Sequence, residues 1–91
     1  MDQTIKCLLL KSDIILITEI VEVGSELGEP DCKLINPFKV VKQDMDTEDL
    51  YGLETWLDFT NQNEVMIHSD SILTIVDPTS DLLSKYFDLL K

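Results

Sequence analysis

The stretch VMIHSDSILTIV, which begins at Val65, sets a histidine, two serines and an aspartate between two apolar runs. These are the residue types of a hydrolase triad, in which a histidine takes a proton from a serine and a carboxylate orients the histidine. In an extended chain, however, successive side chains point to opposite faces, so His68, Ser69 and Asp70 cannot converge on one another unless the backbone folds sharply. A nucleophile elbow would also need glycines beside the serine. The stretch therefore predicts a polar turn between two strands and no catalytic residue.

The same stretch does not predict a metal site. His68 is the single histidine of the chain, and one imidazole beside one carboxylate offers too few fixed ligands for zinc. The acidic run from Asp44 begins like a calcium loop, but its sixth residue is Asp49 instead of glycine and its twelfth is Thr55 instead of glutamate. The three glycines follow no phosphate-binding spacing. We therefore expect a solvated acidic loop, no metal and no cofactor.

Composition limits the partners that the chain can have. Its 91 residues suit a single domain, and 18 acidic against 7 basic side chains give a formal net charge of −11. Such a surface repels phosphodiester backbones at long range, so any contact with RNA would have to be local. The chain is 44% hydrophobic, which is enough to build a core. Because a core of this size is small, we expect partner subunits to add burial.

The cysteines and the charge pattern indicate a cytoplasmic protein. Cys7 and Cys32 stand in no zinc-like or C-x-x-C spacing, which is typical of reduced thiols in a cytosolic setting. The apolar run from Ile5 to Val23 is interrupted by several charged residues, so we expect no membrane span. The N-terminal residues also lack the basic start of a signal peptide.

Apolar runs rich in β-branched residues predict a chain of short strands with turns between them. The segment Ile14–Val23 is apolar on both faces, which predicts a strand that is covered on two sides. Pro37 has no N–H to donate, so it argues for an edge or a bulge. The predicted strand-like runs are Ile5–Leu10, Ile14–Val23, Cys32–Val41, Leu53–Thr60, Val65–Ile67 and Ile72–Val76, with a turn at Lys11–Asp13, a loop over 24–31 and an exposed acidic loop over 42–51.

The last segment changes to a helical period. Asp77 and Pro78 are a favourable helix start, and the following apolar residues predict an amphipathic C-terminal helix at about 78–90. Its apolar stripe would consist of Leu82, Leu83, Tyr86, Phe87, Leu89 and Leu90. About five strands in a row followed by a helix predict a mainly β fold, a small and strongly bent antiparallel sheet or barrel with a C-terminal α-helix.

The order of these features resembles the Sm-like (Lsm) family. The segment Ile5–Val41 is similar to the Sm1 pattern of strand, turn, strand, acidic residue, asparagine and apolar strand. The segment Val65–Ile75 looks like the Sm2 pattern, with His68 and Ser69 where the family has Arg-Gly, and the helix follows the strands instead of preceding them. The whole organisation is similar to small Sm-like proteins of cyanophage and marine viral origin. The resemblance implies one Sm-like domain over 1–91, with strands at about 4–76.

The resemblance also implies a homo-oligomeric ring with an RNA-binding pocket around its pore. Carried over by position, that pocket would contain Asn36, His68 and Ser69, together with Asp31. The implied function is a non-enzymatic, RNA-associated ring that binds single-stranded RNA in the cytoplasm, which would be the host's if the protein is viral. The alternative is a protein-interaction scaffold without RNA binding, favoured by the charge of −11 and by the missing arginine of the Arg-Gly pair. The expected partners are thus other copies of the chain, RNA or other proteins, and no membrane.

Overall fold

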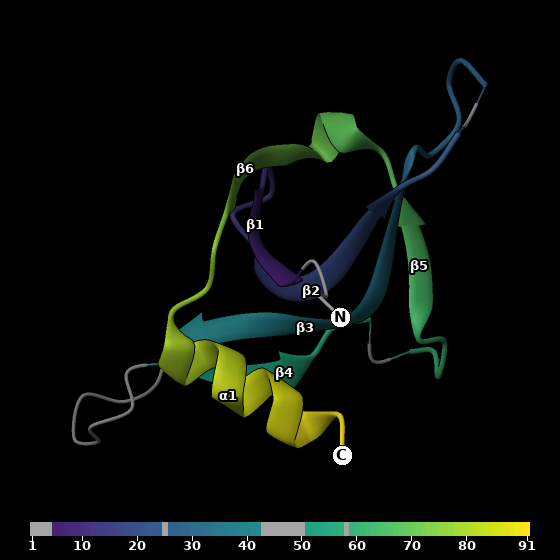
Figure 1. The fold of residues 1–91 in the computed structure, drawn as a ribbon. Helices are drawn as coiled ribbons and strands as arrows, with labels where there is room; N and C mark the ends of the chain where they lie inside the picture. The colour runs from purple at the N-terminus through teal and green to yellow at the C-terminus, as the bar shows by residue number, and fades with distance from the viewer. Residues whose placement is uncertain (1–4, 25, 43–50, 58) are drawn as a thin grey trace.

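The computed structural model describes residues 5–24, 26–42, 51–57 and 59–91. It is mainly β, with antiparallel strands in one bent sheet and a C-terminal helix, so the predicted fold class is confirmed (Figure 1). The elements are β1 (Ile5–Leu10), β2 (Ile15–Glu22), β3 (Cys32–Lys42), β4 (Tyr51–Thr55), β5 (Glu64–Ile67), the 3-10 helix η1 (Ser69–Ser71), β6 (Ile72–Val76) and α1 (Ser80–Leu89).

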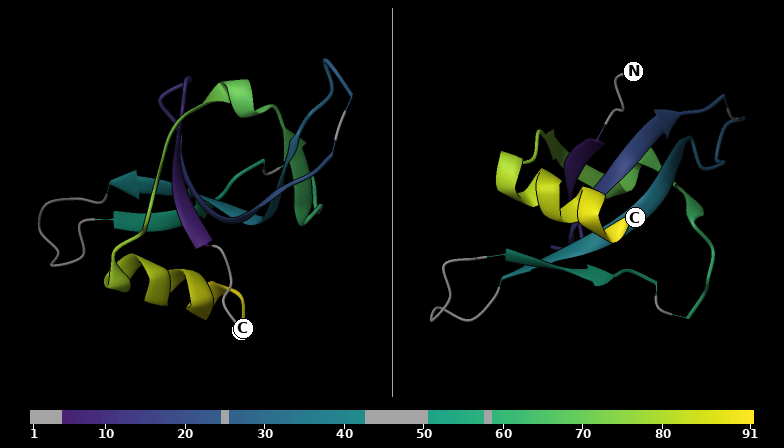
Figure 2. Two further views of the ribbon diagram at one scale, coloured as in Figure 1. Left: turned by 45° about the horizontal axis from the view of Figure 1, so that its top comes forward. Right: turned by 60° about the horizontal axis from the view of Figure 1, so that its bottom comes forward.

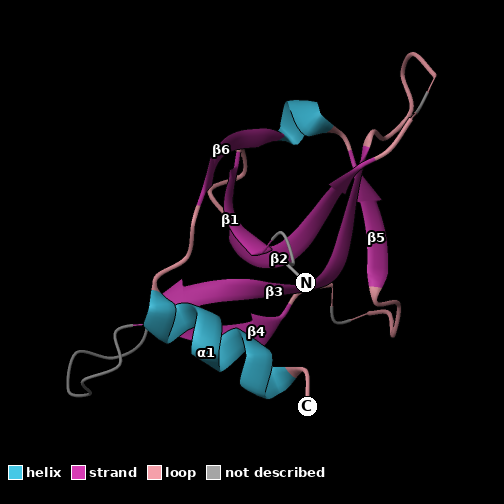
Figure 3. Cartoon of the chain, in the orientation of Figure 1, coloured by secondary structure: helices cyan, strands magenta, loops and turns pink. Residues whose placement is uncertain are grey.

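The sheet has the strand order β4-β3-β2-β1-β6, and β5 pairs with β3 off this path. The long strand β3 therefore pairs with β2 on one side, and on its other side first with β5 and then with β4. At the far end, β6 returns to pair with β1, which bends the sheet back on itself (Figure 3). The six described strands follow the six predicted strand-like runs in order, one more than the expected total of about five.

A bulge divides β3 where its partner changes from β5 to β4. Ile17 pairs with Phe38 while Glu19 pairs with Ile35, so two residues of β3 stand opposite one residue of β2. Pro37 is one of these two, which confirms the predicted bulge. The other is Asn36, whose φ of 54° lies in the left-handed region that asparagine tolerates better than most residues.

The sheet buries apolar side chains on both of its faces. Leu16 and Ile17 are neighbours in β2 with no exposed surface, and they point to opposite sides. The predicted two-sided cover is therefore confirmed at these residues, although Val21, farther along β2, is 37% exposed. One core includes Tyr86 of α1 and so lies beneath this helix, and the other lies on the opposite face of the sheet. Figure 2 shows that α1 lies outside the bend of the sheet. The first core contains Ile5, Cys7, Ile17, Val40 and Tyr86, and the second contains Leu8, Leu10, Leu16, Leu34 and Val65.

The helix begins two residues later than predicted. Its N-cap is Thr79, whose Oγ1 accepts a hydrogen bond from the Leu82 N–H at 3.3 Å. Asp77, predicted as the cap, instead forms an ion pair with Lys6 of β1. Of the predicted apolar stripe, Tyr86 is fully buried and Leu82 and Leu83 pack against the core, whereas the residues near the C-terminal end, Phe87, Leu89 and Leu90, are 37–48% exposed.

The segment predicted as a strand over 53–60 is shorter and begins earlier. The strand β4 ends at Thr55, and Leu57 has a φ of 58°, which a strand does not allow. The Thr60 N–H then donates to the Leu57 carbonyl oxygen at 3.2 Å and closes a turn. The acidic loop, with the run over 44–49, falls mostly outside the described residues, but its predicted ends, Lys42 and Tyr51, belong to β3 and β4. None of the helices in the described ranges has the length and apolar character needed to cross a membrane.

Candidate binding surfaces around the β5–β6 turn

A carboxylate at the start of β3 holds the turn between β5 and β6. The backbone N–H of Ser69 donates to Asp31 Oδ1 at 2.7 Å, and the Ser69 hydroxyl donates to Asp31 Oδ2 at 2.8 Å. These hydrogen bonds favour the charged carboxylate and hold the pKa of Asp31 below its usual value, with a smaller contribution from His68. Both carboxylate oxygens are thus engaged in fixing η1.

The turn is built from its own backbone in the way that the sequence predicts. The Ser71 N–H donates to the His68 carbonyl oxygen at 3.0 Å, and the Ser71 hydroxyl donates to the same oxygen at 2.7 Å. Within the described residues, no serine hydroxyl is hydrogen-bonded to the His68 ring. The serines therefore stabilise a polar turn, and their hydroxyls are directed to a carboxylate and to the backbone.

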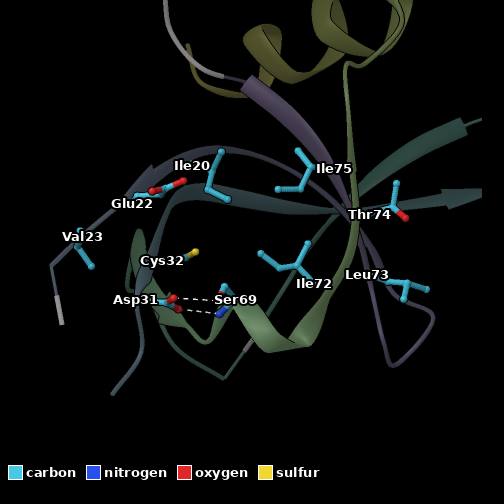
Figure 4. Close-up of a pocket in the computed structure, with 10 residues that line it drawn as sticks. All are labelled: Ile20, Glu22, Val23, Asp31, Cys32, Ser69, Ile72, Leu73, Thr74 and Ile75. Carbon is cyan, nitrogen blue, oxygen red and sulfur yellow. Dashed lines mark hydrogen bonds between the residues drawn. The ribbon is translucent and has the colours of Figure 1, made fainter. Parts of the chain in front are cut away.

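One cavity, of about 400 Å³, opens between η1, β6 and the adjoining ends of β2 and β3. We call it the β6 cavity. In Figure 4, Ile72 and Ile75 project from β6 toward Ile20 of β2, while Leu73 and Thr74 project from the other side of the strand. Its rim carries carboxylates from Glu22 and Asp31 in addition to the Ser69 hydroxyl. The β6 cavity is therefore lined by apolar side chains and by carboxylates together.

The Cys32 thiol also lines the β6 cavity and is buried. Burial raises its pKa, and the carboxylates of Asp31 and Glu22 raise it further. The thiol of Cys7, in the core beneath α1, has a pKa that is raised by burial as well. Both cysteines are free and protonated at neutral pH, so they act as small apolar side chains, as the sequence predicts.

A second cavity, of about 360 Å³, lies on the other side of the turn. It brings together three of the four predicted site residues, namely Asp31, His68 and Ser69. His68 is exposed. The remaining lining includes the carboxylates of Glu26, Glu29 and Asp70. We call this the acidic cavity, because it sets a single imidazole among several carboxylates.

The fourth predicted residue, Asn36, does not line either of these cavities. It lines a third one, of about 250 Å³, between the bulge of β3 and the segment that connects β4 to β5. We call this the amide cavity, because Asn36 shares it with Asn61, Gln62 and Asn63. Trp56 also lines it. The run Asn61-Gln62-Asn63, which follows Trp56 and Phe59 in the same segment, was the sequence signal for this site, but from the sequence it indicates only a bulge or turn.

A group of three or more metal-binding side chains is not found among the described residues. Comparison with known proteins gives one family match: the model of a family of unknown function, DUF6561, matches residues 3–91. Comparison with the curated proteins gives no match.

Proposed function

This chain belongs to the DUF6561 family, and we propose that it is a non-enzymatic, Sm-like subunit that assembles with its own copies into a ring and serves as a protein-interaction scaffold. The observation that carries this proposal is the outer strand β6. Its residues Leu73, Ile75 and Val76 are 60%, 50% and 52% exposed. Apolar side chains on an edge strand favour pairing with another strand.

The backbone of β6 is also available for such pairing. In the described sheet it forms a ladder with β1 alone, through the register from Cys7 with Val76 to Leu10 with Ile72. A strand from another copy on its second edge would pair the remaining backbone groups and would cover the exposed apolar side chains.

The best-suited partner edge is β5 of a neighbouring copy. In the described sheet β5 pairs with β3 alone, and its Met66 is 45% exposed. The alternative edge, β4, is already in contact with α1, and the Lys85 ammonium donates to its Tyr51 carbonyl oxygen at 2.6 Å. Pairing β6 of one copy with β5 of the next joins two different surfaces, and such an interface generates a ring when its rotation closes.

The charges near the predicted pocket favour a protein scaffold over RNA binding. His68 shares the acidic cavity with Glu26, Glu29 and Asp70, and these carboxylates repel a phosphate group. The basic side chains of the chain are seven lysines, with no arginine to stack on a base while carrying a charge. The resemblance to Sm-like proteins is thus proposed for the fold and the assembly, and not for recognition of RNA.

Light scattering coupled to size-exclusion chromatography tests the assembly. The native chain is expected to elute as one closed oligomer at micromolar concentration. Leu73→Glu combined with Val76→Glu places charges on the proposed interface and is expected to yield a folded monomer. The matched control is Leu27→Glu, which makes the same change at a fully exposed leucine of the β2–β3 loop and should leave the oligomer intact.

A native chain that is monomeric and folded under these conditions would contradict the ring. Titration with U-rich and A-rich oligonucleotides at low salt separates the scaffold from the RNA alternative, because electrostatic attraction to nucleic acid is strongest there. The scaffold proposal expects no binding. Binding that His68→Ala and Asn36→Ala abolish would establish the RNA alternative instead.

A further inference from the structure

The amide cavity has a lining unlike the rest of the surface. Among the described residues that line it, none is charged, although 27% of the chain is charged. The polar lining residues are Asn36, Asn61, Gln62, Asn63, Thr55 and Thr60, and the apolar lining residues include Phe38 and Trp56. A ligand there would be neutral, polar and able to lie against an aromatic ring. We propose that the amide cavity binds one ring of a neutral carbohydrate.

The hydrogen-bonding groups of the cavity favour a carbohydrate over a proline-rich peptide or a nucleic acid. A carboxamide and a hydroxyl each offer donors and acceptors. A proline-rich peptide offers mainly carbonyl acceptors, so the acceptor atoms of the cavity would lose water without gaining a partner. Sugar hydroxyls both donate and accept, which matches every polar group in the lining. Nucleobases match as well, but in a nucleic acid they carry phosphates that the net charge of −11 repels.

Three of the four carboxamides are free to receive a ligand. The Gln62 Nε2 donates to the Glu64 carbonyl oxygen. In the part of the chain that the structure describes, the hydrogen bonds leave the side-chain amides of Asn36, Asn61 and Asn63 without partners. Buried polar side-chain atoms without a partner are also not found among the described residues. These amide atoms are therefore open to solvent, where a sugar hydroxyl can replace water.

The cavity is also held in shape before any ligand binds. The Asn36 N–H donates to the Asn63 carbonyl oxygen at 2.7 Å, and the Tyr86 hydroxyl donates to the Asn36 carbonyl oxygen at 3.0 Å. On the opposite wall, the Gln62 N–H donates to Thr60 Oγ1 at 3.2 Å. These bonds tie both walls to the sheet and to α1, which lowers the entropy cost of binding.

Aromatic surface is present beside the amides. Trp56 and Phe38 are both half-buried and line the cavity. Phe59, in the same connecting segment, is 81% exposed. Aromatic faces provide a flat apolar surface against which the C–H groups of a sugar ring can pack. An amide-rich wall beside such rings suits a molecule with hydroxyls at its edge and C–H groups on its face.

Fluorescence and NMR titrations test the proposal directly. Trp56 is the single tryptophan, so its emission reports on this cavity. Maltotriose, cellotriose, mannotriose and triacetylchitotriose are added to the full chain at millimolar concentrations. At least one is expected to change the emission and to shift the side-chain amide signals of Asn61 and Asn63. The double variant Asn61→Ala/Asn63→Ala is expected to weaken that binding at least roughly tenfold.

Both substituted residues are exposed, so the fold should survive, and circular dichroism checks this. The matched control is Ser84→Ala on the exposed side of α1, which should bind as the native chain does. The proposal is overturned if no trisaccharide produces a response, or if the response persists in the double variant. It is equally overturned if free uridine or adenosine binds at the cavity and the sugars do not. None of these results depends on whether the chain forms a ring.

Discussion

The hydroxyl of Tyr86, in the last helix, donates to the carbonyl oxygen of Asn36, 50 residues earlier, at 3.0 Å. The same hydroxyl lies 3.2 Å from the Ile35 carbonyl oxygen, which also accepts from Thr18. Since Tyr86 has no exposed surface, this contact fixes α1 against the bulge from within the core. The helix therefore supports the position at which β3 changes partner.

Replacing Tyr86 with phenylalanine tests this support. The ring and its edge-on contact with Phe38, at 6.0 Å between centroids, would remain. The Asn36 carbonyl oxygen would lose its donor, so Tyr86→Phe is expected to lower the free energy of unfolding by about 1–2 kcal/mol. Urea denaturation followed by circular dichroism measures the change. Tyr86→Ala, which also empties the core, is expected to cost about 3–5 kcal/mol, and equal losses for both variants would contradict a role for the hydroxyl.

Alkaline pH should weaken the fold through the same residue. Burial raises the pKa of Tyr86 to about 12. An unfolded tyrosine has a pKa of about 10. Because the pKa of Tyr86 is higher in the folded than in the unfolded chain, its contribution to the free energy of unfolding is complete below about pH 10. This contribution is lost as the pH rises toward about 12. Denaturation midpoints measured across this window should fall, and the fall should be smaller in Tyr86→Phe.

Removal of the Asp31 carboxylate should loosen the β5–β6 turn. In Asp31→Ala, the Ser69 N–H loses its acceptor, so this amide is expected to exchange with deuterium several-fold faster. Asp70→Ala is the matched control, because it removes a carboxylate from the same turn and should leave the Ser69 exchange rate unchanged. Acid should have the same effect as Asp31→Ala. Because folding lowers the pKa of Asp31, the stability that its carboxylate contributes is present above about pH 4 and is lost below that pH. An unchanged Ser69 rate in Asp31→Ala would contradict the assignment.

The helix cap gives an independent check of where α1 begins. Thr79→Ala removes the oxygen that accepts from the Leu82 N–H and is expected to cost about 1 kcal/mol of stability. Asp77→Ala breaks only an exposed ion pair with Lys6 and should cost less, within about 1 kcal/mol. Thermal unfolding of the two variants side by side measures the difference. If Asp77→Ala proved the more damaging change, the cap would be at Asp77 as the sequence suggests.

The fold was predictable because strand-forming residues gather in separate runs. The apolar run Ile5–Leu10 is β1 to the residue, and Ile72–Val76 is β6. The helix start was not predictable, because Asp77 and Thr79 are both good caps. In the structure Thr79 caps the helix and Asp77 pairs with Lys6, which is 71 residues away. The strand after Gly52 was also misjudged, because Trp56 and Leu57 have strand-forming side chains but leave the sheet at a turn with positive φ.

The candidate site was predictable only in part. The sequence associated Asp31 with His68 and Ser69 through a resemblance, and the hydrogen bonds bring Asp31 and Ser69 together. Asn36 is five positions along β3 from Asp31, and its bulge directs it to a different cavity. A local pattern does not show which cavity a bulged residue lines, because that depends on the strands paired on either side. The amide cavity could not be predicted from the sequence for the same reason, because its walls come from segments that are distant in the chain.

The extra residue in β3 also sets which face of the sheet each half of this strand presents. In a regular strand Leu34 and Phe38, four positions apart, would share a face, yet Leu34 packs in one core and Phe38 packs in the other, beneath α1. The bulge supplies this change of face. Deletion of Pro37 would leave Ile35 opposite Glu19 and Phe38 opposite Ile17 in regular alternation, so a homologue that is one residue shorter here could keep both cores and would lose only the bulge at Asn36.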